Sequence, residues 1–254
     1  MKIIFIFFAF LSLKADTLQA TVDSAVLKHF RHIVQLIRSG NAAALSKKVE
    51  YPIKRSNPLP DIQNAKQFIA YYPTLFDSAF KELVKQYHDS IVFEHHDLYG
   101  LVGGGFIGEI WINEEGKIVT VNYSSQKEQS NKQQLDAKIK RAIYPGINTW
   151  DDNVLVARSE KLLLRIDRTA KGLRYVCWSK GQPTNEKPDI ILYNGVEEQQ
   201  GTMGGWTYTF QNDGWTYIIE DAAICDDPKN CGLFLQLLFD EKVKSNIKLK
   251  EIKQ

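Results

Sequence analysis

Histidines are the side chains of this sequence best suited to metal binding or acid–base chemistry, and all five lie in the first half of the chain: His29, His32, His88, His95 and His96. His29 and His32 share one face if their segment is helical. His95 and His96 are neighbours in an extended segment and therefore point to opposite sides. Because a metal site needs three or four converging ligands, we predict no metal and no cofactor, and a polar loop and helix surface instead.

A nucleophilic enzyme would need a Ser or Cys beside a base. Cys177 has no His in its half of the chain, and the motif Gly-x-Ser-x-Gly is absent. Gly103-Gly104-Gly105 precedes an extended segment, whereas phosphate-binding loops precede a helix, so we expect a bulge or bend there. These patterns favour binding over catalysis.

The other two cysteines are close together in the sequence. Cys225 and Cys231 enclose Asp-Asp-Pro-Lys-Asn, a turn-rich segment that can bring its ends together. We predict a local disulfide between them, with a zinc half-site as the alternative. Cys177 lies in an apolar run and is expected to be a buried free thiol.

Aromatic residues alternate along the two arms of one predicted hairpin: Trp206, Tyr208, Trp215 and Tyr217. Because successive strand residues point to opposite faces, each arm sends its Trp and Tyr to one face. Such a face can be a hydrophobic core stabilised by cross-strand pairs, or a partly exposed surface that binds a protein or glycan partner. Both interpretations stay open.

In the first half of the chain, two helical blocks would position these residues. Residues 21–38 carry apolar side chains at helical spacing, and 61–87 form a second block that Pro73 interrupts. From Leu98 the pattern changes to that of strands, expected at 98–102, 106–112 and 117–123. A polar segment and a short helix at 135–143 follow, up to a boundary at 145–152.

The second half of the chain reads as strands only. The expected strands are 154–157, 162–166, 173–178, 190–193, 206–210, 215–219, 233–239 and 247–252. Residues that favour tight turns lie between several of these strands, at Asn194-Gly195, Gly204-Gly205 and Asn212-Asp213-Gly214. Eight short strands at this spacing are typical of a small sandwich or barrel.

The amino terminus has the pattern of a signal peptide. Met1 and Lys2 precede an apolar run at 3–13, which is too short to cross a bilayer. We predict cleavage near Ala20, with Ala15 as the second choice and an uncleaved anchor as the competing interpretation. The net charge of +2 is near neutral, which argues against nucleic acid as a partner, and no later run suggests a membrane span.

The order of elements in the first half resembles a known family. A helix, a short Tyr-Pro segment, a Phe-rich helical block and strands through Gly-Phe-Ile-Gly-Glu-Ile-Trp-Ile-Asn and Gly-Lys-Ile-Val-Thr-Val-Asn-Tyr are similar to a SnoaL-like domain of the nuclear transport factor two-like superfamily. The resemblance covers about residues 21–125 and implies a cone-shaped α+β, cystatin-like fold. We therefore expect a signal peptide (1–20), a SnoaL-like domain (21–125), a polar helix and linker (126–152) and an all-β sandwich or barrel (153–254).

The functional hypothesis is an exported, non-enzymatic binding protein of the periplasm or extracellular space. Its specific version is an inhibitor or immunity protein against a wall-degrading enzyme or toxin, with an envelope or secreted protein as partner. Trp178-Ser179-Lys180-Gly181 is faintly similar to lysozyme-inhibitor lipoproteins. The alternative is a SnoaL-like enzyme or carrier for a small apolar ligand, whose cone would be lined by His88, His95, Asp97, Tyr99 and Glu109.

Overall fold

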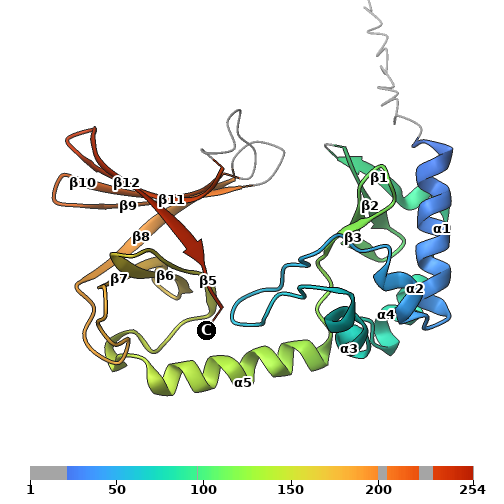
Figure 1. Cartoon of the computed structure of the whole chain (residues 1–254), viewed down its shortest axis with the longest axis horizontal. Coiled ribbons are helices and arrows are strands. Elements are labelled where there is room, and N and C mark those ends of the chain that lie inside the picture. The colour runs from blue at the N-terminus through green and yellow to red at the C-terminus, as the bar shows by residue number, and fades with distance from the viewer. Residues whose placement is uncertain (1–21, 96, 200–204, 223–230, 254) are drawn as a thin grey trace, which may run out of the picture.

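A computed structural model of the chain describes residues 22–95, 97–199, 205–222 and 231–253. The predicted signal peptide and its cleavage site lie outside these residues. Figure 1 shows the arrangement: helices and a small sheet at one end, a barrel at the other, and one long helix that runs from below the barrel to the helical end.

Four short helices precede the first strands. They are α1 (Ser24–Arg38), α2 (Ala42–Ser46), α3 (Ala65–Leu75) and α4 (Ser78–Val84). Asp23 caps α1 by accepting a hydrogen bond from the backbone N of Ala25 at 2.6 Å. Pro73 lies inside α3, which ends two residues later. The buried sides of these helices pack together around Phe30, Phe68 and Phe80.

A four-stranded antiparallel sheet follows, with the strands in the order of the sequence. Its strands are β1 (Val92–His95), β2 (Leu98–Gly103), β3 (Phe106–Ile112) and β4 (Ile118–Val121), and a 3-10 turn, η1 (Asp89–Ile91), leads into β1. Leu101, Phe106 and Ile110 belong to the same core as the helices. The sheet therefore buries one face against the helices.

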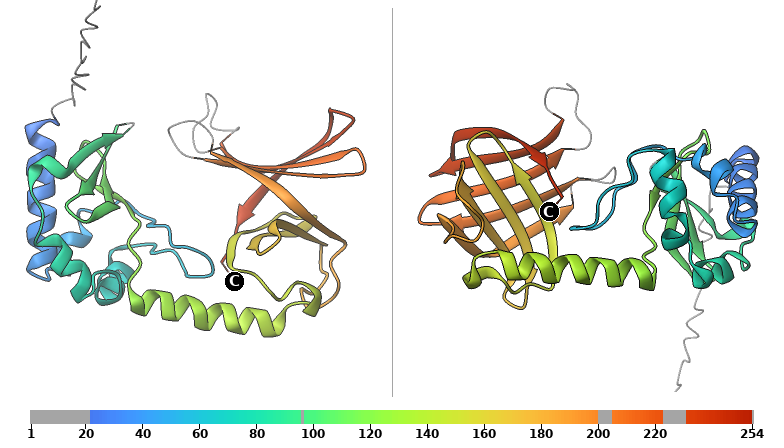
Figure 2. Two further views of the ribbon diagram at one scale, coloured as in Figure 1. Left: turned by 180° about the vertical axis from the view of Figure 1, so that it is seen from behind. Right: turned by 60° about the horizontal axis from the view of Figure 1, so that its bottom comes forward.

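Helix α5 (Gln126–Ala142) joins this part to the barrel, and η2 (Pro145–Ile147) follows it. The helix is polar around most of its surface, which is typical of a helix that bridges two parts of a protein. Ser125 caps it by accepting a hydrogen bond from the backbone N of Glu128 at 3.0 Å. Figure 2 shows α5 spanning the distance between the small sheet and the barrel.

The second half closes into an eight-stranded barrel in the order β10-β11-β12-β5-β6-β7-β8-β9. The strands are β5 (Asp152–Arg158), β6 (Leu162–Thr169), β7 (Gly172–Ser179), β8 (Ile190–Gln199), β9 (Trp206–Asn212), β10 (Trp215–Ala222), β11 (Gly232–Phe239) and β12 (Lys242–Glu251). Apolar side chains fill its interior, including Ile166, Tyr175, Phe210 and Ile219, so it is a packed core and not an open channel.

The predicted fold class was wrong. We expected a cone-shaped helix-plus-sheet domain followed by a sandwich or barrel, but the chain is built on an eight-stranded closed barrel and a separate four-stranded sheet. The outer strands β1 and β4 have four residues each, and so short a meander covers helices without wrapping into a clear cone. Barrel closure depends on β12 pairing with β5 through Glu251 and Ala157, a distant contact that strand periodicity cannot reveal.

The prediction of a turn at Asn194-Gly195 was also wrong, because β8 runs through both residues. On β7, Leu173 pairs with Gly195 and Tyr175 pairs with Leu192, so Arg174 faces two residues of β8. This is a β-bulge. Asn194 takes the left-handed conformation there with φ 58, which Asn tolerates better than most residues.

The loop between α2 and α3 makes a second connection to the barrel, beside α5 (Figures 1 and 2). Lys54 Nζ lies 2.8 Å from Glu251 Oε2, and Lys253 Nζ donates to the carbonyl of Arg55 at 2.7 Å. Asn57 Nδ2 donates to the carbonyl of Val154 at 3.1 Å. The two parts of the chain are thus held together by α5 and by this loop.

Candidate functional site

The site begins on the outer face of β6 and β7, which is covered by the segment after α5. Barrel strands usually point one side outward to water, but Val176 and Trp178 pack on the outside against Ile143, Ile147 and Trp150. Three charged residues share this covered face. Arg165 and Asp167 lie two apart on β6, and Arg174 pairs with Asp167 across the strands.

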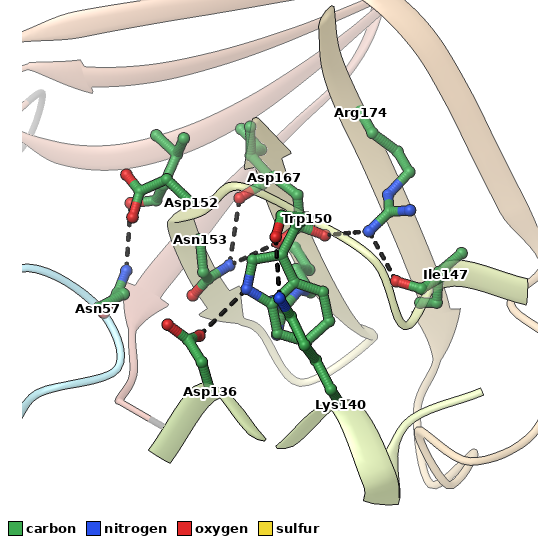
Figure 3. Close-up of polar contacts among 12 residues, drawn as sticks. Asn57, Asp136, Lys140, Ile147, Trp150, Asp152, Asn153, Asp167 and Arg174 are labelled. Carbon is green, nitrogen blue, oxygen red and sulfur yellow. Dashed lines mark hydrogen bonds and ion pairs between the residues drawn. The ribbon is translucent and has the colours of Figure 1, made fainter. Parts of the chain in front are cut away.

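Asp167 is the acceptor at the centre of this cluster. It receives a hydrogen bond from Arg165 Nε at 2.7 Å. Figure 3 shows the two others, from Arg174 Nη2 at 2.8 Å and from Asn153 Nδ2 at 3.0 Å. Arg165 and Asp167 are completely buried, and Arg174 is 2% exposed. One carboxylate thus serves two guanidinium groups, so the buried Arg165–Asp167–Arg174 triad carries an excess positive charge.

Trp150 lies between the triad and α5. Its Nε1 donates to Asp136 at 3.1 Å, and its carbonyl accepts from Lys140 Nζ at 2.9 Å (Figure 3). The Arg165 guanidinium lies 3.9 Å from the centre of its ring, and Lys140 Nζ lies 4.7 Å from it. These are cation–π distances, so Trp150 fixes both cations in position.

Burial lowers the pKa of Arg165, and the neighbouring charge of Asp167 opposes that change. A guanidinium starts from so high a pKa that it keeps its proton in proteins. Arg165 therefore keeps its positive charge despite its burial.

A hollow of about 420 Å³ opens beside the triad. Its walls come from the end of α5, the segment around η2, the β6–β7 turn and β8. Lys140, Lys171 and Arg174 line it as cations, against one carboxylate, Asp151. Asn148, Thr149 and Thr169 add polar groups, and Tyr193 adds an aromatic ring that is 40% exposed.

Local structure explains how two of these walls are held. Thr169 Oγ1 donates to the carbonyl of Gly172 at 2.9 Å and accepts from the backbone N of Lys171 at 3.1 Å, which fixes the turn that carries Lys171. The bulge in β8 opposite Arg174 includes Tyr193. Bulges redirect side chains near functional sites, and here Tyr193 lines the hollow beside Arg174.

Arg174 lines the hollow and has one buried donor that is not used in a hydrogen bond within the described residues. Its Nη2 donates to Asp167 and, at 2.7 Å, to the carbonyl of Ile147. Its Nε has no hydrogen-bond partner among the residues that the structure describes. A buried donor without an acceptor costs about 1–3 kcal/mol, so an acceptor entering the hollow would recover part of that cost.

The five residues predicted to line a cone lie elsewhere and do not converge on this hollow. His88 Nδ1 is hydrogen-bonded to Ser90 Oγ at 2.7 Å, and Glu109 Oε2 accepts from the backbone N of Ile107 at 2.6 Å. Tyr99 is buried in the first core, His95 lies on β1 near Trp111, and Asp97 occupies the β1–β2 turn with φ 58. Within the described ranges no three His, Cys, Asp or Glu residues are placed to hold a metal ion.

The aromatic hairpin divides between core and surface. Tyr208 is 7% exposed inside the barrel, and Tyr217 packs partly against the same core near Tyr175. Trp206 is 41% exposed at one end of β9, and the ring of Trp215 lies 5.1 Å from that of Phe239 in a tilted arrangement at the other end of the hairpin. The aromatic face therefore points mainly into the barrel.

A second hollow, of about 670 Å³, lies at the tips of the β9–β10 and β11–β12 hairpins. Asp213, Asp240 and Glu241 line it together with Trp215. Its walls are acidic.

Cys177 is free and buried, as predicted, and burial raises the pKa of its thiol. Cys225 lies outside the described residues, so the Cys225–Cys231 disulfide stays a prediction. In the described part of the chain no helix is both long and apolar enough to cross a bilayer.

Sequence reasoning missed the triad and the hollow. The available clue was the presence of Arg165, Asp167 and Arg174 inside otherwise apolar strands, where unpaired charges are rarely buried. Comparison with known proteins adds no relative: no family model, no curated protein and no solved structure matches the chain.

Proposed function

We propose that the protein is an exported, non-enzymatic binding protein that holds a ligand in the hollow beside the Arg165–Asp167–Arg174 triad. One observation carries this proposal: Arg174 is 2% exposed, lines the hollow, and keeps an Nε–H without an acceptor among the described residues. The buried network fixes the walls in advance, and preorganised walls reduce the entropy cost of binding.

Binding, and not turnover, is favoured by the way these groups are used. Arg165, Asp167, Asn153 and Trp150 are joined to one another or to the backbone by hydrogen bonds and ring contacts. The groups that line the hollow are chiefly cations and polar side chains. Cationic and polar donors hold and orient a ligand, whereas acid–base catalysis also needs a group whose pKa matches the working pH.

Export rests on the pattern at residues 1–20 and is tested separately. The full chain carrying a carboxy-terminal reporter that is active only outside the cytoplasm should give reporter activity. Replacing the apolar run 3–13 by polar residues should abolish that activity without changing expression. Activity that persists in the altered chain would overturn export.

Binding is tested by thermal unfolding of the purified protein against a panel of neutral, cationic and anionic small molecules. At least one compound should raise Tm in a saturable way, because a ligand that binds only the folded state stabilises it. Mass spectrometry should recover that compound unchanged. A panel without any saturable shift would contradict binding, and conversion of the compound would contradict the non-enzymatic assignment.

A further inference from the structure

We infer that the ligand of this hollow is a small organic anion whose phosphate or carboxylate group is held by Arg174, Lys140 and Lys171. This inference rests on the proposed function and specifies the chemical class of the ligand.

The charge of the walls selects the sign of the ligand. Lys140, Lys171 and Arg174 face the hollow with Asp151 as the only acidic residue among its lining groups. The charge of Asp167 does not fully neutralise that of Arg174, because the same carboxylate also binds Arg165. An anion would complete the charge balance of the triad, whereas a cation would add to an existing excess.

The donors fit an oxyanion. An Arg side chain presents N–H groups in a planar fork that matches the oxygens of carboxylates and phosphates. Arg174 is held by Asp167 and by the carbonyl of Ile147, both through Nη2, and its Nε–H remains to be used. Lys140 and Lys171 supply charges from α5 and from the β6–β7 turn, so cations from three elements surround the space.

The aromatic wall indicates that the anion is organic. Tyr193 is 40% exposed and lines the hollow with Ala170. A hollow of about 420 Å³ is also larger than a bare oxyanion needs, and falls within the usual range for small-molecule sites. A planar or apolar group attached to the oxyanion would pack on the ring of Tyr193.

Calorimetric titration of the full-length protein tests this inference with four probes: phenyl phosphate, benzoate, inorganic phosphate and neutral benzyl alcohol. Phenyl phosphate or benzoate should bind more tightly than inorganic phosphate, and benzyl alcohol should not bind. Whichever of these two aromatic anions binds more tightly identifies the group that the site prefers, a phosphate or a carboxylate. Binding should weaken as salt is added, because part of the attraction is electrostatic.

Matched variants locate the site. Lys171→Gln should weaken binding of the aromatic anion about tenfold, the usual effect of losing one charged hydrogen bond. Lys161→Gln removes the same charge from an exposed turn at the opposite end of β6 and should leave the affinity unchanged. Tyr193→Ala should weaken phenyl phosphate binding but not that of inorganic phosphate. Circular dichroism confirms that each variant is folded.

Two outcomes would overturn the inference. Equal losses of affinity in Lys171→Gln and Lys161→Gln would show that binding of the anion depends only on the net charge of the protein. If none of the anions binds while a neutral compound raises Tm in the panel described above, the protein is still a binding protein and only the ligand class is wrong. If no compound of any charge binds, the proposed function itself fails.

Discussion

The two ends of α5 are both anchored by buried charges, yet the two anchors differ in how completely their charges are paired. At the first end, Glu128 accepts from Arg55 Nε at 2.7 Å and from Tyr71 Oη at 3.0 Å, and Arg55 also donates to the carbonyl of Tyr123 at 2.8 Å. Here one carboxylate meets one guanidinium, and both are buried.

At the second end, Asp136 and Trp150 connect α5 to the triad, where one carboxylate meets two guanidinium groups. The first anchor is neutral, because its one carboxylate is paired with one guanidinium. The second keeps a positive excess beside an open space. A buried ion pair alone indicates a structural role, whereas an unbalanced buried cluster of charges next to a hollow indicates a binding site.

Asp167→Asn should have the largest effect on stability. Removing this carboxylate takes away the buried charge that Arg165 and Arg174 share, and breaking a buried ion pair costs about 3–5 kcal/mol. Urea unfolding should show a loss in that range. Asp240→Asn, at an exposed hairpin tip, should change the free energy of unfolding by less than about 0.5 kcal/mol.

Glu128→Gln should also destabilise the protein, by about 3 kcal/mol, and less than Asp167→Asn. Only one guanidinium loses its counter-charge, and Arg55 keeps its bonds to the carbonyls of Val121 and Tyr123. The variant should bind the aromatic anion with unchanged affinity. A loss of affinity in folded Glu128→Gln would show that the two anchors are not independent.

Alkaline pH should weaken the first anchor. Burial, followed by the charge and hydrogen bond of Glu128, raises the pKa of Tyr71 above its usual value. The folded state therefore favours the neutral phenol of Tyr71. The contribution of this phenol to the free energy of unfolding is complete below about pH 10 and is lost as the pH rises further.

Urea midpoints measured between neutral and strongly alkaline pH test this expectation. Tyr71→Phe should be less stable than the native chain at neutral pH and should lose less stability above about pH 10. Identical alkaline profiles for the two proteins would rule out Tyr71 as a source of the pH dependence.

The smallest effect is expected at the loop that connects the two parts. Lys54 is largely exposed where it meets Glu251, and exposed ion pairs contribute about 0–1 kcal/mol. Lys54→Gln should therefore lower the free energy of unfolding by less than about 1 kcal/mol. A larger loss would mean that this contact, and not α5, determines how the two parts are joined.

The sequence predicted individual elements better than their assembly. The helix expected at 21–38 is α1, and the hairpin expected at 206–219 is β9 and β10, because an apolar stripe and an Asn-Asp-Gly turn are local properties. Helix α5 was underestimated as a short helix at 135–143. It has no broad apolar stripe, although Ser125 with Glu128 three residues later matches a capping box.

The candidate site was out of reach for a physical reason. Alternation predicts that Arg165, Asp167 and Arg174 face outward from the barrel core, and they do. Outward-facing residues are usually solvated, but the segment around Ile147 and Trp150 covers them here. That cover arises from packing between distant segments, which periodicity does not encode. The same limit explains why the sequence left a sandwich and a barrel undecided for the second half of the chain.

An anion site beside the triad is tested by following the side-chain Nε–H resonance of Arg174 by NMR during titration with phenyl phosphate and benzoate. Arg174→Lys identifies the resonance. We expect this resonance to shift downfield and to saturate with the affinity measured by calorimetry, while the Arg55 Nε–H resonance stays unchanged. A saturating titration in which Arg174 does not shift, or in which both resonances shift alike, would contradict an anion site beside the triad.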